Sequence, residues 1–195
     1  MRITGGTKRG QLLAPWENAD IRPMRDFVRT AMFNILNDLV PKCCFLDLFS
    51  GTGSVGLEAL SRGAASAVFV DRSISACAIA RQNLALLGFL DKGHVMQADF
   101  AYGVKQLEGR GSKFDLLFVG PPYGKGLAEL ALSKLGASSI LIPGAIVVTE
   151  VFKKEEMNNR YGNLELFNRR VYGDNLLLFY DVADKEGRCI QSFNE

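Results

Sequence analysis

The chain has few of the residues that build metal sites. It contains one histidine, His94, and four cysteines, none of them in a CxxC pair, so the sequence argues against a zinc site. It also lacks a long hydrophobic run, because its most apolar stretch, residues 137–148, is too short to span a bilayer and is interrupted by Pro143 and Gly144. Reduced thiols suit a cytosolic protein. We therefore expect a cytoplasmic protein with no metal and no membrane contact.

An excess of charge of one sign is also absent, since the 195 residues carry a net charge of only +2. The distribution is uneven, however, and basic residues outnumber acids within residues 1–30. A helix is predicted to open at Pro23, and Arg22, Arg25 and Arg29 follow one another along one of its flanks. Two interpretations stay open for these arginines: a solvated helix face, or a contact with the phosphates of a nucleic acid.

From residue 43 onward, apolar runs of strand length alternate with helical patterns. Strands are predicted at 43–48, 66–71, 114–119 and 145–151, with a weaker one at 94–97, and helices at 54–62, 74–87 and 126–135. This alternation predicts a doubly wound α/β fold with a mostly parallel, Rossmann-like sheet. Residues 164–172 and 176–182 predict an antiparallel hairpin at the end. We expect one domain, 1–195, in which a basic extension and helix (1–40) precede the α/β core (43–195).

The first predicted strand runs into a glycine-rich loop that begins at Asp47 and contains Gly51, Gly53 and Gly56. In a doubly wound sheet this turn lies at the carboxyl edge, where ligands bind. Asp71 ends the next strand and is placed to accept hydrogen bonds from ribose hydroxyls. The same glycine pattern fits a nicotinamide dinucleotide, but Asp47 would repel a pyrophosphate. A carboxylate there suits a ligand with an ammonium and a sulfonium group, which indicates S-adenosylmethionine.

A third acid, Asp99, follows the weaker strand and is adjacent to Phe100. Asp99 could accept the amino group of adenine while Phe100 packs on the ring, although a helix cap is an equal alternative.

The predicted strand 114–119 runs directly into Gly120-Pro121-Pro122-Tyr123. The prolines stiffen this turn and leave carbonyl oxygens that can accept from an amino group. Tyr123 offers a flat face for a base that has been turned out of its stack. The turn therefore predicts methyl transfer to the amino group of a base, although a proline-rich strand end with a buried tyrosine is the alternative.

Together these motifs resemble the bacterial 16S rRNA guanine-N2 methyltransferases (the RsmD family) along the whole chain. The matching segments are Arg2–Gly6, Arg22–Leu36, Phe45–Gly53, Glu58–Ala64, Pro121–Tyr123 and Arg170–Asp174. The glycine loop is shared with many methyltransferases, whereas the amino-terminal segment and the Pro-Pro-Tyr turn are more specific.

The resemblance implies a class I methyltransferase fold, S-adenosylmethionine as cofactor, and 16S rRNA in an assembling or assembled small subunit as partner. It implies that Asp47, Gly51 and Gly53 hold the methionine part of the cofactor. Asp71 would hold the ribose and Asp99 the adenine, while Tyr123 would hold the target base. The full expected sets are Asp47, Phe49, Ser50, Gly51, Gly53, Asp71, Arg72, Asp99 and Phe100 for the cofactor, Gly120, Pro121, Pro122 and Tyr123 for catalysis, and Arg22, Arg25 and Arg29 for RNA.

One position departs from the family pattern, because Gly120 stands where such enzymes carry Asp or Asn. Loss of that oriented acceptor should raise the activation free energy by about 2.7–4 kcal/mol, so Gly120→Asp is expected to raise the rate. The alternatives are a cofactor-binding RNA module with weakened catalysis, a DNA amino-methyltransferase, and an NAD-dependent oxidoreductase.

Overall fold

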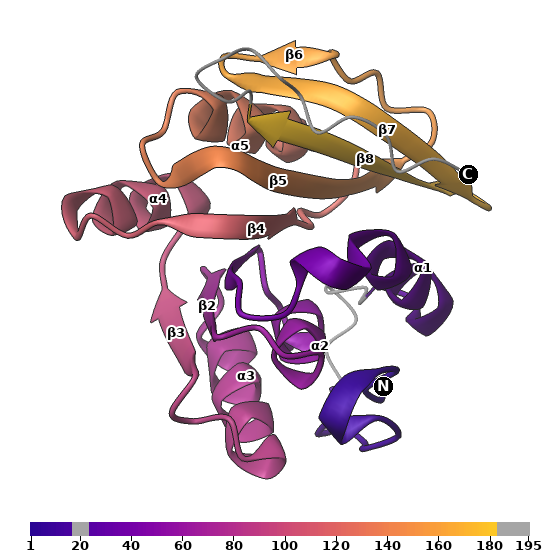
Figure 1. Ribbon diagram of the computed structural model, residues 1–195, viewed down its shortest axis with the longest axis vertical. Coiled ribbons are helices and arrows are strands. Elements are labelled where there is room, and N and C mark those ends of the chain that lie inside the picture. Colours follow the sequence, from indigo (N-terminus) through magenta and orange to yellow (C-terminus); the bar gives the residue numbers. More distant parts are fainter. Residues whose placement is uncertain (17–23, 183–195) are drawn as a thin grey trace.

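The computed structural model describes residues 1–16 and 24–182, which form one eight-stranded sheet with helices on both faces (Figure 1). The strand order is β3-β2-β1-β4-β5-β8-β7-β6. Strands β1 to β5 are parallel, and β8, β7 and β6 extend the sheet in antiparallel fashion. The strands are β1 Cys44–Leu48, β2 Ser66–Asp71, β3 Gly93–Gln97, β4 Phe114–Val119, β5 Leu141–Phe152, β6 Arg160–Tyr161, β7 Leu164–Tyr172 and β8 Asn175–Val182.

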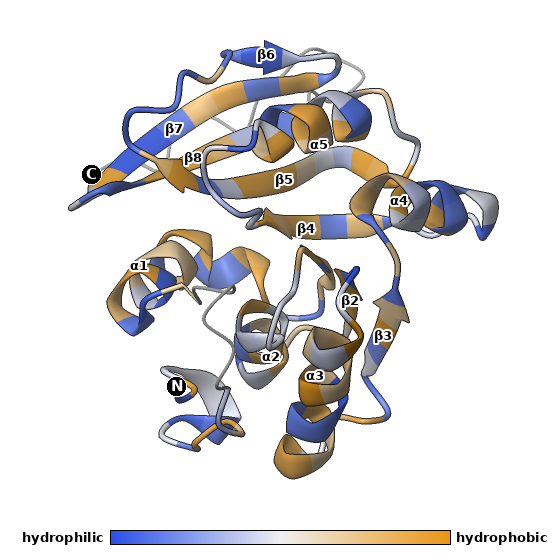
Figure 2. Cartoon of the chain, turned by 180° about the vertical axis from the view of Figure 1, so that it is seen from behind, coloured by the Kyte–Doolittle hydropathy of each residue, from blue (hydrophilic) through white to orange (hydrophobic). Residues whose placement is uncertain are grey.

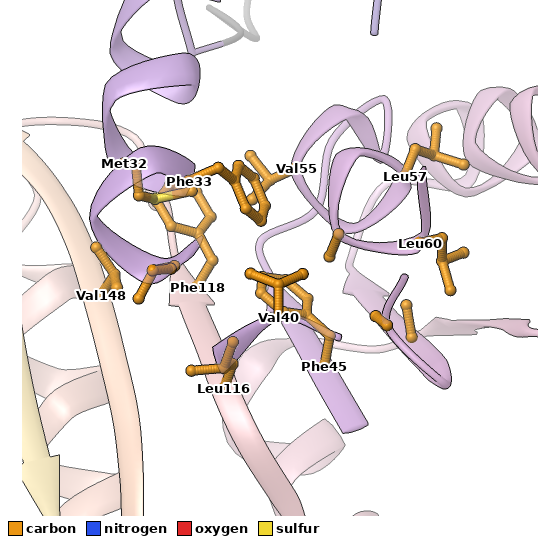
Figure 3. Close-up of a cluster of buried hydrophobic side chains, with 14 of the residues drawn as sticks. Met32, Phe33, Val40, Phe45, Val55, Leu57, Leu60, Leu116, Phe118 and Val148 are labelled. Carbon is orange, nitrogen blue, oxygen red and sulfur yellow. The ribbon is translucent and has the colours of Figure 1, made fainter. Parts of the chain in front are cut away.

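The helices divide the core into two layers. They are α1 Asp26–Leu36, α2 Ser54–Ser61, α3 Ile74–Leu87, α4 Phe100–Gly109 and α5 Leu127–Gly136, with short 3-10 helices η1 at Gly6–Lys8 and η2 at Asn37–Leu39. Helices α1, α2 and α3 pack on one face of the sheet, where Phe33, Phe45 and Phe118 meet (Figure 3). Helices α4 and α5 cover the other face. Strands β4 and β5 are accordingly largely hydrophobic, whereas β7 carries several hydrophilic residues (Figure 2).

The predicted fold class is confirmed, including the parallel core and the final hairpin across Gly173 and Asp174. Strand 66–71, helix 74–87 and strand 114–119 have the predicted bounds. Helix α4 was not predicted. Helix α1 begins at Asp26 instead of Pro23, which lies outside the described residues. In the described part of the chain no helix is long and apolar enough to cross a bilayer.

The amino-terminal segment is fastened to α2 by a buried carboxylate, that of Glu58. Its two oxygens accept hydrogen bonds from the Thr4 amide at 2.8 Å and the Thr4 hydroxyl at 2.9 Å. They also accept from Arg29 Nε at 3.3 Å and Arg62 Nε at 2.9 Å. Glu58 and Arg29 are both fully buried and compensate each other, with Arg62 as a second partner of Glu58 and Asp26 as a second partner of Arg29. The network joins the first residues of the chain, α1 and the helix that follows the glycine loop.

Candidate active site at the carboxyl edge of the sheet

A cavity of about 740 Å³ opens at the carboxyl ends of β1, β2, β3 and β4. It lies where the chain reverses its direction of winding, between the adjacent strands β1 and β4, which is where doubly wound sheets bind ligands. All of the predicted cofactor and catalytic residues line this cavity except Gly53: Asp47, Phe49, Ser50, Gly51, Asp71, Arg72, Asp99, Phe100, Gly120, Pro121, Pro122 and Tyr123.

Backbone amides in the glycine loop donate to acids and carbonyls of the protein itself. Gly51 N–H donates to Asp71 Oδ2 at 2.8 Å, and Gly53 N–H donates to the Ser50 carbonyl at 2.8 Å. Both glycines have positive φ, +52° and +78°, a conformation that costs glycine little. A pyrophosphate site needs loop amides that point at the ligand. Since two of the loop amides are already engaged, the loop disfavours the dinucleotide alternative.

Asp71 is fixed by two backbone donors while it faces the cavity. Its Oδ2 accepts from Gly51, and its Oδ1 accepts from the Ser73 amide at 2.9 Å. Each carboxylate oxygen can accept two hydrogen bonds, so both oxygens keep capacity for a ligand's hydroxyl groups.

Asp47 is only 1% exposed and is more deeply buried than the other two acids of the cavity, Asp71 and Asp99. Its Oδ2 accepts from Gly56 N–H at 2.9 Å. Burial raises the pKa of Asp47 to about 8, against the smaller lowering effect of the Gly56 hydrogen bond; the nearby Asp71 raises it further. The carboxyl group is therefore mostly protonated at neutral pH until a cation enters the loop. This changes the sequence argument, which treated Asp47 as a permanent charge.

Asp99 caps a helix, as one of its two predicted roles requires, while its contact with adenine stays a prediction. Its Oδ1 accepts from the Ala101 and Tyr102 amides at 3.0 Å each, and so caps α4. The same exposed side chain lines the cavity, where Oδ2 can accept from a ligand. Phe100 lies next to it and packs against Phe49, with ring centroids 5.2 Å apart. Phe49 adopts a positive φ of +69°, a strained conformation for this residue that places its ring at the cavity wall.

Ser50 provides an independent test of whether the cavity fits a polar ligand. Its hydroxyl is buried and has no hydrogen-bond partner among the described residues. Leaving a buried hydroxyl unpaired costs about 1–3 kcal/mol, which a polar ligand atom would recover. Together with the acceptors on Asp71 and Asp99, this hydroxyl fits an amino-acid nucleoside such as S-adenosylmethionine.

The predicted substrate end of the cavity is the turn after β4. Thr149, which is fully buried in β5, donates its hydroxyl to the Val119 carbonyl at 2.8 Å, while Gly120 N–H donates to the Leu48 carbonyl at 3.2 Å. These bonds hold the start of the turn in place. A Cβ added at Gly120 would lie 2.5 Å from Cε1 of Phe118. The Phe118 ring thus occupies the space that an Asp side chain would need.

Glu150 is a cavity residue that the sequence analysis missed. It is 5% exposed, and its Oε1 accepts from Asn175 Nδ2 at 2.6 Å. Val119 pairs with Thr149, so Glu150 and Gly120 occupy the next position on adjacent strands and lie on the same face of the sheet. The available signal was a charged residue within an otherwise apolar predicted strand.

The prediction of RNA contact has a different outcome for each of the three arginines. Arg22 lies outside the described residues, and Arg25 is exposed. The prediction that Arg29 contacts RNA is wrong, because its side chain is fully buried and bonded to Glu58 and Asp26. Arg29 lies on the buried face of α1 because Met32 and Phe33, three and four residues later, pack in the core.

Comparison with known proteins agrees with this geometry. The family model described as Conserved hypothetical protein 95 matches residues 1–181. Ribosomal RNA small subunit methyltransferase D of Escherichia coli strain K12 is 31% identical over 175 residues, covering 89% of this chain and 85% of the relative. The protein of the same name from Haemophilus influenzae is 31% identical over 158 residues, covering 80% and 81%.

Two solved structures superpose over nearly the whole fold. The Escherichia coli protein yhhF matches with a TM-score of 0.83 and 29% identity, covering 95% of this chain and 99% of its own. A hypothetical protein of Thermus thermophilus matches with a TM-score of 0.80 and 31% identity, covering 94% and 99%. The chain therefore belongs to the Conserved hypothetical protein 95 family, as a relative of ribosomal RNA small subunit methyltransferase D, which confirms the family resemblance seen in its motifs.

Proposed function

We propose that this chain transfers the methyl group of S-adenosylmethionine to the N2 amino group of a guanine in small-subunit rRNA. One observation carries the proposal: a single cavity runs from three acids at strand ends to the Gly-Pro-Pro-Tyr turn. The relatives named as methyltransferases of small-subunit rRNA support the choice of substrate. For such a reaction we propose the cytoplasm as location and an assembling or assembled small subunit as partner.

At the cofactor end, the chain supplies hydrogen-bond acceptors for a ligand rich in donors. Asp71 would hold the ribose hydroxyls, and Asp99 Oδ2 would accept the adenine amino group while Phe100 packs on the ring. The Ser50 hydroxyl and Gly51 would meet the methionine part, with Asp47 behind them as the counter-charge.

At the substrate end, the bound cofactor supplies an electrophilic methyl group. The guanine N2–CH3 bond forms as the sulfonium S–CH3 bond breaks, S-adenosylhomocysteine leaves, and N2 loses one proton. Tyr123 would stack on the extruded base, and the carbonyls of Gly120 and Pro121 would accept from the amino group. Catalysis is then mainly positioning and electrostatics.

Glu150 is our candidate for the carboxylate that Gly120 does not provide. It lines the same cavity on the neighbouring strand at the level of Gly120, and Asn175 fixes one of its oxygens. A carboxylate there would accept a hydrogen bond from the amino group and take the proton from N2 after methylation.

The experiment is transfer of a labelled methyl group to small subunits from cells that lack this protein, followed by mass mapping of the methylated nucleotide. N2-methylguanine in the small-subunit rRNA is the expected product. Methylation of adenine or cytosine, or of DNA alone, would contradict the proposal. Tyr123→Ala is expected to abolish transfer without changing cofactor affinity measured by calorimetry, whereas Lys134→Ala on α5 serves as a surface control.

Gly120 favours a second candidate, a cofactor-binding RNA module with weakened catalysis. Cofactor binding without methyl transfer on small subunits would support this candidate. Calorimetry with NADH and S-adenosylmethionine side by side separates both from an oxidoreductase, since only the oxidoreductase should bind NADH.

A further inference from the structure

Beyond the cavity, the tip of the β7–β8 hairpin and the start of α1 form an exposed patch of aromatic and basic residues. We call it the hairpin platform, and it consists of Arg25, Phe27, Lys153, Lys154, Arg170 and Tyr172, all exposed except Tyr172, which is half-buried. Phe27 is 52% exposed, and its ring meets that of Tyr172 edge to face, with centroids 6.0 Å apart. The two elements lie side by side although 145 positions separate these rings in the sequence (Figure 1).

Strand register places this platform in line with the substrate end of the cavity. Glu150 pairs with Leu177, which in turn pairs with Arg170, so all three share one face of the sheet. The next such row ends at Tyr172. Two strand spacings, roughly 10 Å, separate β5 from β7. A polynucleotide whose base entered the cavity would therefore reach the platform within one or two nucleotides.

The charge of the platform suits phosphate groups. Four of its six residues are cations, and all four are exposed. Asp174 lies among them, and Lys153 Nζ contacts its Oδ1 at 2.8 Å. The hydrogen bond and charge of Lys153, with Arg25 and Lys154, lower the pKa of Asp174, which places these cations around the hairpin turn. A cluster of this kind attracts a polyanion to a helix and hairpin that also present the exposed ring of Phe27.

We propose that the hairpin platform binds the single-stranded nucleotide next to the target base. The base of this nucleotide stacks on the exposed ring of Phe27, which Tyr172 supports edge to face, while the cations contact its phosphates. The proposal rests on the RNA substrate of the proposed function. The exposed apolar surface of the platform is small. The neighbouring Val171 is also exposed, but it pairs with Leu176 and lies on the opposite face of the sheet from Tyr172, so it does not enlarge the platform. One exposed ring suits the stacking of one base and is much smaller than a protein interface.

The test compares Phe27→Ala and Lys154→Ala with matched surface controls on α5, Leu130→Ala and Lys134→Ala. Leu130 is 57% exposed, similar to Phe27, and α5 lies on the other face of the sheet. Methyl transfer is measured on undermethylated small subunits, and binding is measured with a short single-stranded RNA by fluorescence anisotropy over a range of salt concentrations.

Phe27→Ala is expected to raise KM and the RNA dissociation constant at least about fivefold, with kcat and cofactor affinity unchanged. Lys154→Ala should reduce the slope of log affinity against log salt by about one unit. Values equal to those of the controls, or a Phe27→Ala variant in which only kcat or thermal stability changes, would overturn the proposal.

The two proposals fail separately. If the wild-type protein binds RNA through Phe27 but methylates no rRNA, the platform stands and the proposed function fails. If rRNA is methylated and Phe27→Ala leaves KM and RNA affinity unchanged, the platform fails and the proposed function stands. Binding of a protein component of the small subunit that depends on Phe27, without any effect on naked RNA, would also reject the nucleotide as occupant.

Discussion

Replacing Asp47 by asparagine is expected to stabilise the ligand-free protein at neutral and alkaline pH while weakening cofactor binding. Desolvation raises the pKa of this carboxyl group from 3.8 to about 8, so the folded state holds the proton more tightly than the unfolded chain does. The stability contributed by the protonated group is complete below pH 3.8, declines as pH rises, and is lost above pH 8. Asparagine has the same shape, can accept from Gly56 through its carbonyl, and does not ionise.

The size of the effect follows from 1.36 kcal/mol for each pKa unit. Raising the pH from 3 to 7 should remove roughly 4 kcal/mol of stability, because Asp47 ionises in the unfolded chain while the folded state still holds most of its proton. Between pH 5 and pH 9, the stability of Asp47→Asn relative to wild type should rise by a similar amount, about 4 kcal/mol. That is a large share of the roughly 5–15 kcal/mol that holds most domains folded.

The assay is urea unfolding of both proteins at pH 5, 7 and 9 without cofactor. Asp115→Asn is the control, because Asp115 is a half-buried strand carboxylate whose Oδ2 accepts from the Cys44 amide at 2.7 Å. The cofactor adds a second readout. A cation in the loop should ionise Asp47, so at pH 7 about 0.9 proton should be released per cofactor bound, as measured by calorimetry in two buffers. A stability difference that does not change with pH, together with no proton release, would refute the reasoning.

Three further predictions concern separate parts of the structure. Asp99→Asn keeps a good cap for α4 but turns the second acceptor into a donor, so cofactor affinity should fall roughly tenfold with little change in Tm. If Asp99→Asn and Asp71→Asn both lost the same affinity and both had a lower Tm, the loss would reflect general disruption of the fold. Glu58→Gln should destabilise the fold by about 3–5 kcal/mol in urea, because the buried Arg29 would keep only the partly exposed Asp26 as a counter-charge. A cost below about 1 kcal/mol would contradict this. Gly120→Asp should be destabilised and gain no activity, because its Cβ would contact the Phe118 ring. Gly120→Asp combined with Phe118→Leu should transfer methyl groups faster than Phe118→Leu alone. If Gly120→Asp alone were faster than wild type, the Phe118 ring would have to move freely.

The strands and most helices could be predicted because burial alone sets their pattern. In β4, for example, five of six residues are buried, and the apolar run had the correct ends. Helix α4 was missed because its first turn looked like the end of a ligand motif. A cap at Asp99 is visible in the sequence, yet the buried Val104 and Leu107 that follow it were not recognised as a helical stripe. The information was local in that case and could have been used.

Arg29 and Glu150 were misjudged for a different reason, since their environments come from distant parts of the chain. The partner of Arg29 is Glu58, 29 residues away, and the partner of Glu150 is Asn175, 25 residues away. No spacing rule within a single helix or strand predicts such pairs. The sequence therefore indicated which side chains surround the glycine loop, but only the fold showed which charges are buried and compensated.

The arrangement of donors and acceptors explains why one kind of ligand suits this cavity throughout. The acids at its edge are each held by backbone amides: Asp47 by Gly56, Asp71 by Gly51 and Ser73, and Asp99 by Ala101 and Tyr102. These bonds consume donors that a phosphate would need and leave carboxylate oxygens facing the cavity. An ammonium group, ribose hydroxyls, the adenine amino group and the amino group of guanine are all donors. A cavity that offers acceptors at both ends thus favours the cofactor and the target base for the same physical reason.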